Sequence, residues 1–246
     1  LSLVWTPHDF AALNIRGKLG PPDATHWLGT DQLGRDVVSQ LMAAARNSMS
    51  VALAAVLLGG SIGILLGLLA SAMGGWIEDA VMRLADLGFA FPALLFAIML
   101  AAVFGPSLTN AVLAIAFINI PVFARVTRAS ANQIWTRDYV TAARAAGMNR
   151  FTISRDHILP NIAAPVIVQA TIEFAVAILA EAALSYLGLG AQPPAPSWGR
   201  MLAEAQTLMY LAPQLAIYPG LCIVTAVLGA PVFLWILLKR RGLVEK

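Results

Sequence analysis

Charged residues are scarce in this sequence of 246 residues. Asp, Glu, Lys and Arg make up only 12% of the chain, whereas hydrophobic residues make up 59%. A soluble domain carries roughly 25% charged residues, so this composition excludes an ordinary water-soluble domain. The formal net charge is only +3, and the basic residues lie in clusters, which argues against a nucleic-acid-binding protein. The mean hydropathy of +0.76 predicts a chain that lies in a lipid bilayer.

Side chains that carry chemistry are also few. Cys222 is the single cysteine, so an internal disulfide and a thiol metal cluster are excluded, and we expect it to be a small buried apolar residue. His8, His26 and His157 are scattered along the chain, which predicts no metal site. No Ser-His-Asp or zinc-protease pattern is present, which disfavours a membrane enzyme. The phosphate-binding pattern G-x-x-x-x-G-K-[ST] is missing too, so we expect this chain to bind no cofactor and not to hydrolyse ATP.

Long apolar runs are what the sequence has in abundance. Open sheets cannot cross lipid and the alternation of a barrel is missing, so the runs predict helices. The expected fold is an all-α, polytopic membrane bundle. Its five expected spans are Val51–Met73, Leu87–Gly105, Leu108–Ala124, about Ile162–Leu189, and Pro213–Leu238.

The basic residues predict the orientation of these spans. Six arginines lie between the third and fourth spans, from Arg125 to Arg155, and Lys239, Arg240, Arg241 and Lys246 follow or end the fifth. Basic residues favour the cytoplasmic side, so loop 128–160 and the C-terminus are expected inside. Residues 1–50 would then form an external segment with an amphipathic helix that leads into the membrane domain of residues 51–246. A cytoplasmic N-terminus would need one more helix ahead of Leu1.

Small residues recur at every fourth position of the first span. Such a ridge allows the backbone of another helix to approach closely. Static packing in the bundle is the favoured interpretation, and a helix contact that must slide or rock is the alternative. The ridge consists of Ala55, Gly59, Gly63, Gly67, Ser71 and Gly75.

The passage "AARAAGMNRFTISRDHILPN", residues 142–161, is polar and rich in arginine. Thr136 or Asp138 can begin a helix that Gly147 ends. Asn149 can cap a second short helix, which Pro160 should break before the chain re-enters the membrane. Its apolar anchors (Phe151, Ile158, Leu159) lie among Arg150, Arg155 and His157, and this surface suits docking onto a partner protein. A solvated basic loop and a helix lying on anionic lipid are the alternatives.

These residues resemble a known family. Ala142 and Ala143, then Gly147, then the segment His157–Asn161 are similar to the "EAA" cytoplasmic loop of bacterial ABC importer permeases. Further segments resemble the second permease of dipeptide, oligopeptide and nickel importers: "HWLGTDQLGRDVVSQLMAAARNSMSVAL" at 26–53, "AEAALSYLGLG" at 180–190 and "PSWGRML" at 196–202. The resemblance covers about residues 26–228. It departs at Thr141, where the family motif has Glu, and in the last segment, which is more similar to the end of an iron-siderophore permease.

The resemblance implies a type I ABC importer permease fold, which would have six spans. It implies a bacterial inner-membrane subunit for di- or oligopeptides, nickel or a related solute such as glutathione. Its implied partners are a homologous second permease, two ATPase subunits that use ATP and magnesium, and an external solute-binding protein. The short helix at Asn149–Leu159 would couple the chain to the ATPases. The implied coupling residues are Ala142, Ala143, Gly147, Asn149, Arg150, Phe151, Arg155, His157, Leu159 and Pro160.

Two acidic residues interrupt the fourth span. Glu173 and Glu181 are eight positions apart and project within about one helix face. Carboxylates inside a membrane usually face a bundle interior or a water path, so both are candidates for the translocation path. For Glu181, a position near the outer interface beside Ser185 and Tyr186 is the favoured alternative.

The polar loop "GTDQLGRD", residues 29–36, lacks the spacing of a calcium or phosphate site. We expect Thr30 or Asp31 to cap the external helix, with Arg35 within reach of the carboxylates.

Two other functions remain open from sequence alone. A stand-alone secondary transporter or channel should show inverted repeats with paired broken helices, and the small-residue span has no second copy. A truncated or inactive permease is the other alternative, because both ends of the chain depart from the family pattern.

Overall fold

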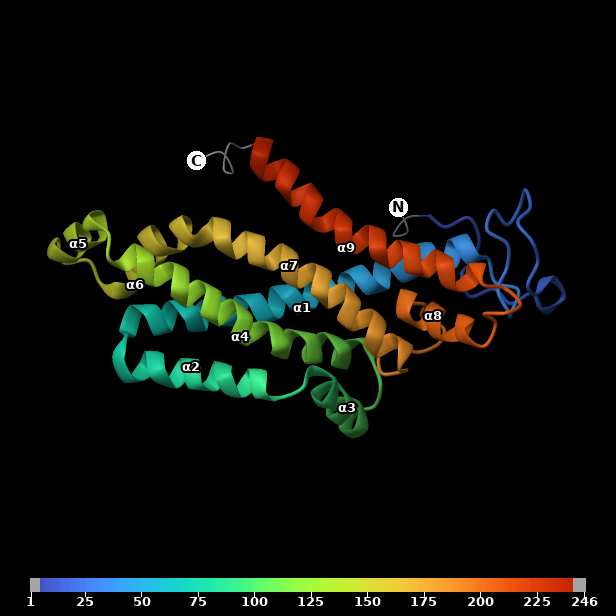
Figure 1. Cartoon of the computed structure of the whole chain (residues 1–246), viewed down its shortest axis with the longest axis horizontal. Coiled ribbons are helices and arrows are strands. Elements are labelled where there is room, and N and C mark those ends of the chain that lie inside the picture. The colour runs from blue at the N-terminus through green and yellow to red at the C-terminus, as the bar shows by residue number, and fades with distance from the viewer. Residues whose placement is uncertain (1–4, 241–246) are drawn as a thin grey trace. The chain divides into compact units, whose positions relative to one another are not determined.

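The computed structural model describes residues 5–240, the last eight by their backbone alone, and this part of the chain is built from helices joined by turns and loops (Figure 1). A short 3-10 turn (Ile15–Gly17) precedes the first long helix. The helices are α1 (Val37–Met73), α2 (Gly75–Ala90), α3 (Ala93–Phe104), α4 (Leu108–Trp135), α5 (Asp138–Ala145), α6 (Arg150–Ile153), α7 (Leu159–Tyr186), α8 (Trp198–Gln206) and α9 (Gln214–Arg240), with a π-helical turn at Ser154–Ile158.

Four stretches of helix are long and apolar enough to cross a membrane, and a fifth is reached if α2 and α3 count as one bent span. The helical fold and the approximate number of spans agree with the sequence. The prediction of a continuous second span at Leu87–Gly105 is wrong, because the chain bends by 80° between α2 and α3. Phe91 is extended there, with φ −82° and ψ 120°, and Pro92 follows it. A proline disfavours helical backbone at the residue before it, so the helix ends at Ala90.

Helices α1 and α4 extend well beyond their apolar runs. Helix α1 begins at Val37 and passes without a break through residue 50, where the external segment was expected to end. Thr30 and Asp31 do not cap it, contrary to expectation. Asp36 does, because its carboxylate accepts a hydrogen bond from the backbone N–H of Ser39 at 2.8 Å. The hydroxyl of Thr30 instead donates to the Gly17 carbonyl at 2.5 Å.

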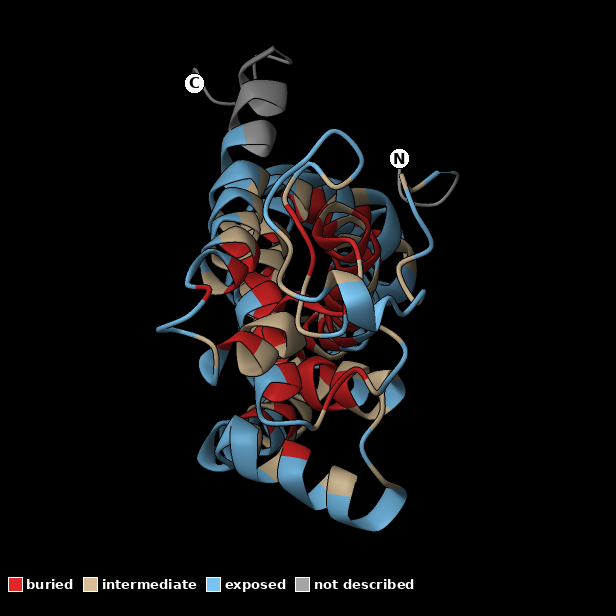
Figure 2. Ribbon diagram, turned by 90° about the vertical axis from the view of Figure 1, so that its right-hand side faces the viewer, coloured by how far each residue is buried: buried red, intermediate tan, exposed pale blue. Residues whose placement is uncertain are grey.

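The structure divides into two compact units, each containing parts of the long helices. The first holds the chain up to Leu53, residues 97–112 and residues 176–229. The second holds residues 54–96 and 113–175 and the chain after Gly229. Residues coloured as buried and as exposed alternate along the helices (Figure 2). Many exposed side chains on α1 and α9 are apolar, among them Leu65 and Leu228, as expected of surfaces that contact lipid.

In the second unit, three glycines bring α1 against α4. A Cβ atom on Gly59, Gly63 or Gly67 would lie 2.4–2.6 Å from a backbone carbonyl oxygen of α4, closer than real Cβ atoms approach. This is the close contact that their four-residue spacing predicted. Gly75 does not belong to the ridge, because α1 ends at Met73 and Gly75 begins α2 with φ +54°.

Polar contacts tie the ends of α1, α2 and α4 together in the same unit. The guanidinium of Arg128 and the amide of Asn132, both on α4, donate to the carboxylate of Glu78 on α2. The indole N–H of Trp135 donates to the hydroxyl of Ser71 at 3.4 Å. These contacts explain why α4 continues to Trp135, beyond its apolar run, since its last turns have partners of their own.

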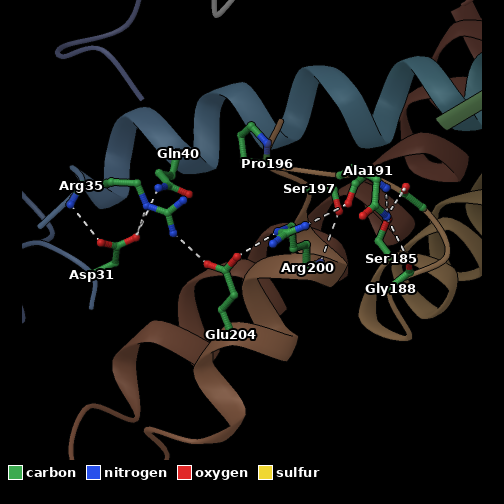
Figure 3. A network of polar contacts seen from close by, with 12 residues as sticks. Asp31, Arg35, Gln40, Ser185, Gly188, Ala191, Pro196, Ser197, Arg200 and Glu204 are labelled. Atoms are coloured by element: carbon green, nitrogen blue, oxygen red, sulfur yellow. Dashed lines mark hydrogen bonds and ion pairs between the residues drawn. The ribbon is translucent and has the colours of Figure 1, made fainter. Parts of the chain in front are cut away.

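In the first unit, a polar network joins the start of α1 to α8 (Figure 3). The carboxylate of Glu204 accepts hydrogen bonds from Arg35 and from Arg200, both at 2.8 Å. Arg35 also donates to Asp31 at 2.6 Å, which confirms the expected pairing in this loop. The indole N–H of Trp198 donates to the Leu41 carbonyl at 3.3 Å, so hydrogen bonds hold α8 against the start of α1.

Candidate functional site

Helix α5 ends in a glycine turn that fixes the direction of the chain. Gly147 has φ +84° and donates its N–H to the Arg144 carbonyl at 3.0 Å, while Met148 donates to the Ala143 carbonyl at 3.1 Å. This pair of hydrogen bonds is the Schellman motif, and it confirms that Gly147 ends the helix. The start differs from expectation, because the N-cap residue is Arg137 and it makes no side-chain capping bond.

One face of helix α5 is buried against the rest of the chain. Val140 is fully buried and Ala143 is buried, whereas Ala142 is exposed. The ring of Tyr139 lies 6.2 Å from the ring of His157, centroid to centroid. The hydroxyl of Thr141 donates to the Arg137 carbonyl at 3.4 Å, so this side chain bonds to its own helix. The family motif carries a glutamate at position 141, which is Thr141 in this chain. Burial of Val140 and Ala143 therefore contributes to holding α5 in place.

Asn149 begins α6 as the sequence predicted. Its side-chain oxygen accepts a hydrogen bond from the backbone N–H of Thr152 at 2.8 Å, which satisfies one of the free amides at the start of the helix. The expected break at Pro160 is wrong, because helical structure continues from Arg150 to Tyr186.

A π-helical turn accounts for this continuity. Leu159 donates its backbone N–H to the carbonyl of Ser154, five residues earlier. Proline in an ordinary helix lacks an N–H and its ring clashes with the carbonyl four residues before it. The wider π turn next to Pro160 relieves that clash, so the chain enters α7 without a loop. The segment from Arg150 to Leu159 is thus the first part of a membrane-length helix.

The exposed and buried faces of this segment are sharply divided. Phe151 is 75% exposed and Leu159 is 38% exposed. Ile153 and Ile158 are fully buried, so Ile158 belongs to the core of this chain and the expectation that it anchors a partner is wrong. The sequence analysis did not single out Ile153. The spacing of Ile153, Ile158 and Ile162 along one continuous helix is the signal that would have found it.

The arginines of the segment have different environments. Arg150 donates to the carbonyl oxygens of Ala72 and Met73, at 2.8 and 3.0 Å. These are the last carbonyls of α1, which lack partners within their helix, so Arg150 ties the start of α6 to the end of α1. Arg155 pairs with the neighbouring Asp156, with 2.6 Å between Nε and Oδ1, and both side chains face outward.

An apolar hollow of about 500 Å³ lies beside these residues, within the second unit. Its walls come from the last turns of α1 and from the start of the α6–α7 helix. Phe151 and Leu159 line it, and Arg150 and Arg155 supply its charged edge. A partly apolar surface with arginines beside an exposed aromatic ring has the composition of a protein contact site.

The two acidic residues of α7 are both covered by the chain itself. Glu173 is 7% exposed and accepts a hydrogen bond from the Gln169 amide at 2.8 Å. Glu181 is fully buried and accepts one from the Ser185 hydroxyl at 2.6 Å. The Ser185 contact is the one expected for Glu181, and its position near the outer interface stays a prediction. A place for either residue in the translocation path stays a prediction.

Comparison with known proteins identifies the family. The family model described as "binding-protein-dependent transport system inner membrane component" matches residues 59–240, which extends past Leu228, where the resemblance in sequence was expected to end. The chain is similar to the dipeptide transport system permease protein DppC of Alkalihalophilus pseudofirmus, with 43% identity over 91% of this chain and 74% of that protein.

Two further relatives are similar over most of their length. The glutathione transport system permease protein GsiD of Pectobacterium atrosepticum is 42% identical over 85% of this chain and 69% of that protein. The di/tripeptide transport system permease protein DppC of Pseudomonas aeruginosa is 46% identical over 82% of this chain and 67% of that protein.

The fold also has solved counterparts. A chain of the MetNI methionine ABC transporter in an inward facing conformation superposes with a TM-score of 0.70 and 16% identity, over 82% of this chain and 95% of that one. A chain of an amino acid ABC transporter superposes with a TM-score of 0.64 and 20% identity, over 82% and 94%. These matches show an ABC importer permease fold. Together with the family model and the relatives, they show that the chain belongs to the family of inner membrane components of binding-protein-dependent transport systems.

Proposed function

We propose that this chain forms half of the translocation path of an ATP-driven importer for short peptides, and that α5 and α6 transmit the movement of ATPase subunits to the path. The family gives the chain its place as a multi-pass permease component of the inner membrane. The relatives are named for dipeptides, di- and tripeptides and glutathione, which all share a peptide backbone. That shared chemistry favours a short peptide over a nickel complex as the solute.

The observation that carries the coupling role is the unbroken helix from Arg150 to Tyr186 with Phe151 exposed at its first turn. A partner protein that binds Phe151 can move or tilt α7 directly, because no flexible loop separates Phe151 from α7. The Asn149 cap and the Gly147 turn fix the start of this helix. Arg150 links the same point to the last carbonyls of α1, so a displacement of α6 would also reach α1. Such rigid-body movement of helices is a common switching mechanism.

The partners follow from the same proposal. The sequence has no phosphate-binding loop, so ATP and magnesium would be bound by two separate ATPase subunits and not by this chain. A homologous second permease would complete the path, and an external binding protein would deliver the solute. The arginines around α5 and α6 favour the cytoplasmic side for this segment. The family favours this function over a stand-alone transporter or channel.

Co-purification in detergent tests the coupling role. Wild type, Phe151→Asp and the control Tyr210→Asp would be expressed with the second permease and the ATPases of the same transporter. Both side chains are exposed aromatic rings, and Tyr210 lies outside the α5–α6 segment. Removing a central aromatic anchor typically costs at least 2 kcal/mol of binding, about a 30-fold loss of affinity. Phe151→Asp should therefore lose the ATPases while Tyr210→Asp keeps them. Equal recovery of ATPase by all three proteins contradicts the coupling role.

A further inference from the structure

Two histidines and a carboxylate that are far apart in sequence meet in the first unit. His8, His26 and Asp36 each offer one donor atom, and these three atoms lie within 4.8 Å of one another. The rings of His8 and His26 are 4.7 Å apart, centroid to centroid. The sequence predicted no metal site because the histidines are scattered, and the fold brings two of them together.

The spacing of the first two donors suits a metal ion. Nδ1 of His26 lies 3.0 Å from Oδ1 of Asp36. Two ligands of a tetrahedral zinc ion, each about 2.0–2.1 Å from the metal, lie roughly 3.3 Å apart. A metal ion can therefore bind between Nδ1 and Oδ1, with the proton of the neutral His26 ring carried on Nε2 instead.

The third donor is oriented by a backbone carbonyl. Nε2 of His8 lies 2.8 Å from the Thr25 carbonyl, which only accepts hydrogen bonds, so Nε2 carries the ring proton. Nδ1 of His8 then keeps its lone pair for a metal. A backbone carbonyl that orients a ligating imidazole in this way is a common feature of zinc sites. His8 is exposed, and its donor atom already lies within 4.8 Å of the other two.

Asp36 is held as an oriented ligand. Its side chain is 1% exposed, and its second oxygen accepts hydrogen bonds from the backbone N–H and hydroxyl of Ser39. The two hydrogen bonds from Ser39 fix the orientation of the carboxylate, so Oδ1 is directed toward His26.

We propose that His8, His26 and Asp36 form a binding site for a divalent metal ion of the zinc type. Two imidazoles and one carboxylate are typical zinc ligands, and water would complete a tetrahedral shell. The ion would cross-link three segments: the chain around His8, the loop that carries His26 and the start of α1. The backbone N–H of His8 already donates to Ser39 at 2.9 Å, so the ion would reinforce an existing contact. This proposal does not depend on the proposed transport function.

Zinc titration of the full chain, purified in detergent without a polyhistidine tag, tests the site. Calorimetry should show one zinc ion per chain, and cobalt should give the visible absorption of a four-coordinate site. His8→Ala should weaken zinc binding about 10- to 100-fold, and so should His26→Ala and Asp36→Asn. The matched control is His157→Ala, which removes the third histidine from outside this cluster and should bind zinc like wild type.

The outcomes separate the site from incidental binding. His8 is exposed, so its replacement should leave the metal-free protein as stable as wild type, and thermal unfolding without metal checks this for every variant. Absence of saturable binding in wild type would overturn the proposal. An equal loss of affinity in His157→Ala and His8→Ala would also overturn it, since that pattern shows nonspecific binding to surface histidines.

Discussion

At the scale of single residues, the contact between α1 and α4 depends on missing methyl groups. A Cβ atom on Gly63 would meet the Ile120 carbonyl oxygen at 2.5 Å and the Phe123 Cβ at 2.6 Å. Neither atom is the end of a flexible side chain, so the helices themselves would have to move apart. Gly229 in α9 is also helical, but nothing lies within 4 Å of its Cβ position. An alanine at position 63 therefore tests the close packing of two helices, whereas an alanine at position 229 tests only the intrinsic helix preference of the residue.

We predict that Gly63→Ala lowers the free energy of unfolding by about 1–3 kcal/mol, the usual cost of overfilling a packed interface. Gly229→Ala should leave it unchanged or raise it by up to about 1 kcal/mol, since alanine favours a helix more than glycine does. Thermal unfolding of the two variants in the same detergent measures the difference. Equal midpoints for both variants would show that the α1–α4 contact tolerates a methyl group.

The residue scale is also where sequence rules worked best. Gly147 and Asn149 were assigned correctly because each acts through its own backbone neighbourhood. Asp31 and Arg35 were paired correctly for the same reason. Ile158 was placed on the wrong face, because the face of a helix that is buried depends on which other helices pack against it.

At the scale of elements, the Arg150 side chain joins the start of α6 to the end of α1 by hydrogen bonds. Arg150 donates to two carbonyls at the end of α1, and a cation at a helix C-terminus is favoured by the helix dipole as well. Arg144 on α5 is also an exposed arginine, and it serves as a control for the loss of one positive charge.

Arg150→Ala should loosen the start of α6 while leaving the long helices in place. Loss of the Arg150 hydrogen bonds to the last carbonyls of α1 costs about 1 kcal/mol at an exposed site. This free energy corresponds to about a fivefold change in the equilibrium for local opening of the segment. Hydrogen exchange at the bonded amides of Thr152 and Ile153 should therefore become about fivefold faster, and Arg144→Ala should exchange there like wild type. Unchanged exchange in Arg150→Ala would show that buried Ile153 alone holds the segment.

Element boundaries were harder to predict than the Asn149 cap and the Gly147 turn. The apolar runs gave the positions of α1 and α4 but not their lengths, because their polar ends are stabilised by contacts with other helices, such as Glu78 with Arg128. Pro92 interrupts its helix, whereas Pro160 does not. The two prolines differ in their surroundings, since a π turn precedes Pro160, and sequence alone did not reveal that turn.

At the scale of the whole molecule, the fold class and approximate number of spans followed from composition, because a chain with so few charges has few alternatives to a helical bundle. The family followed from the motifs around Gly147 and residues 26–53. The meeting of His8 with His26 and Asp36 was not predictable, since it requires loops that fold back onto the start of α1. The orientation rests on the distribution of arginine and lysine and is open to direct measurement.

The orientation predicts opposite labelling of two exposed positions. In a Cys222→Ser background, Lys18→Cys should react with a membrane-impermeant maleimide in intact spheroplasts, because residue 18 would lie outside. Ala145→Cys, at the end of α5, should react only after the membrane is permeabilised. Both side chains are exposed, so burial in the chain does not explain a difference. The reverse pattern would place α5 and α6 outside the cell, where cytoplasmic ATPases cannot reach Phe151, and would contradict the proposed coupling.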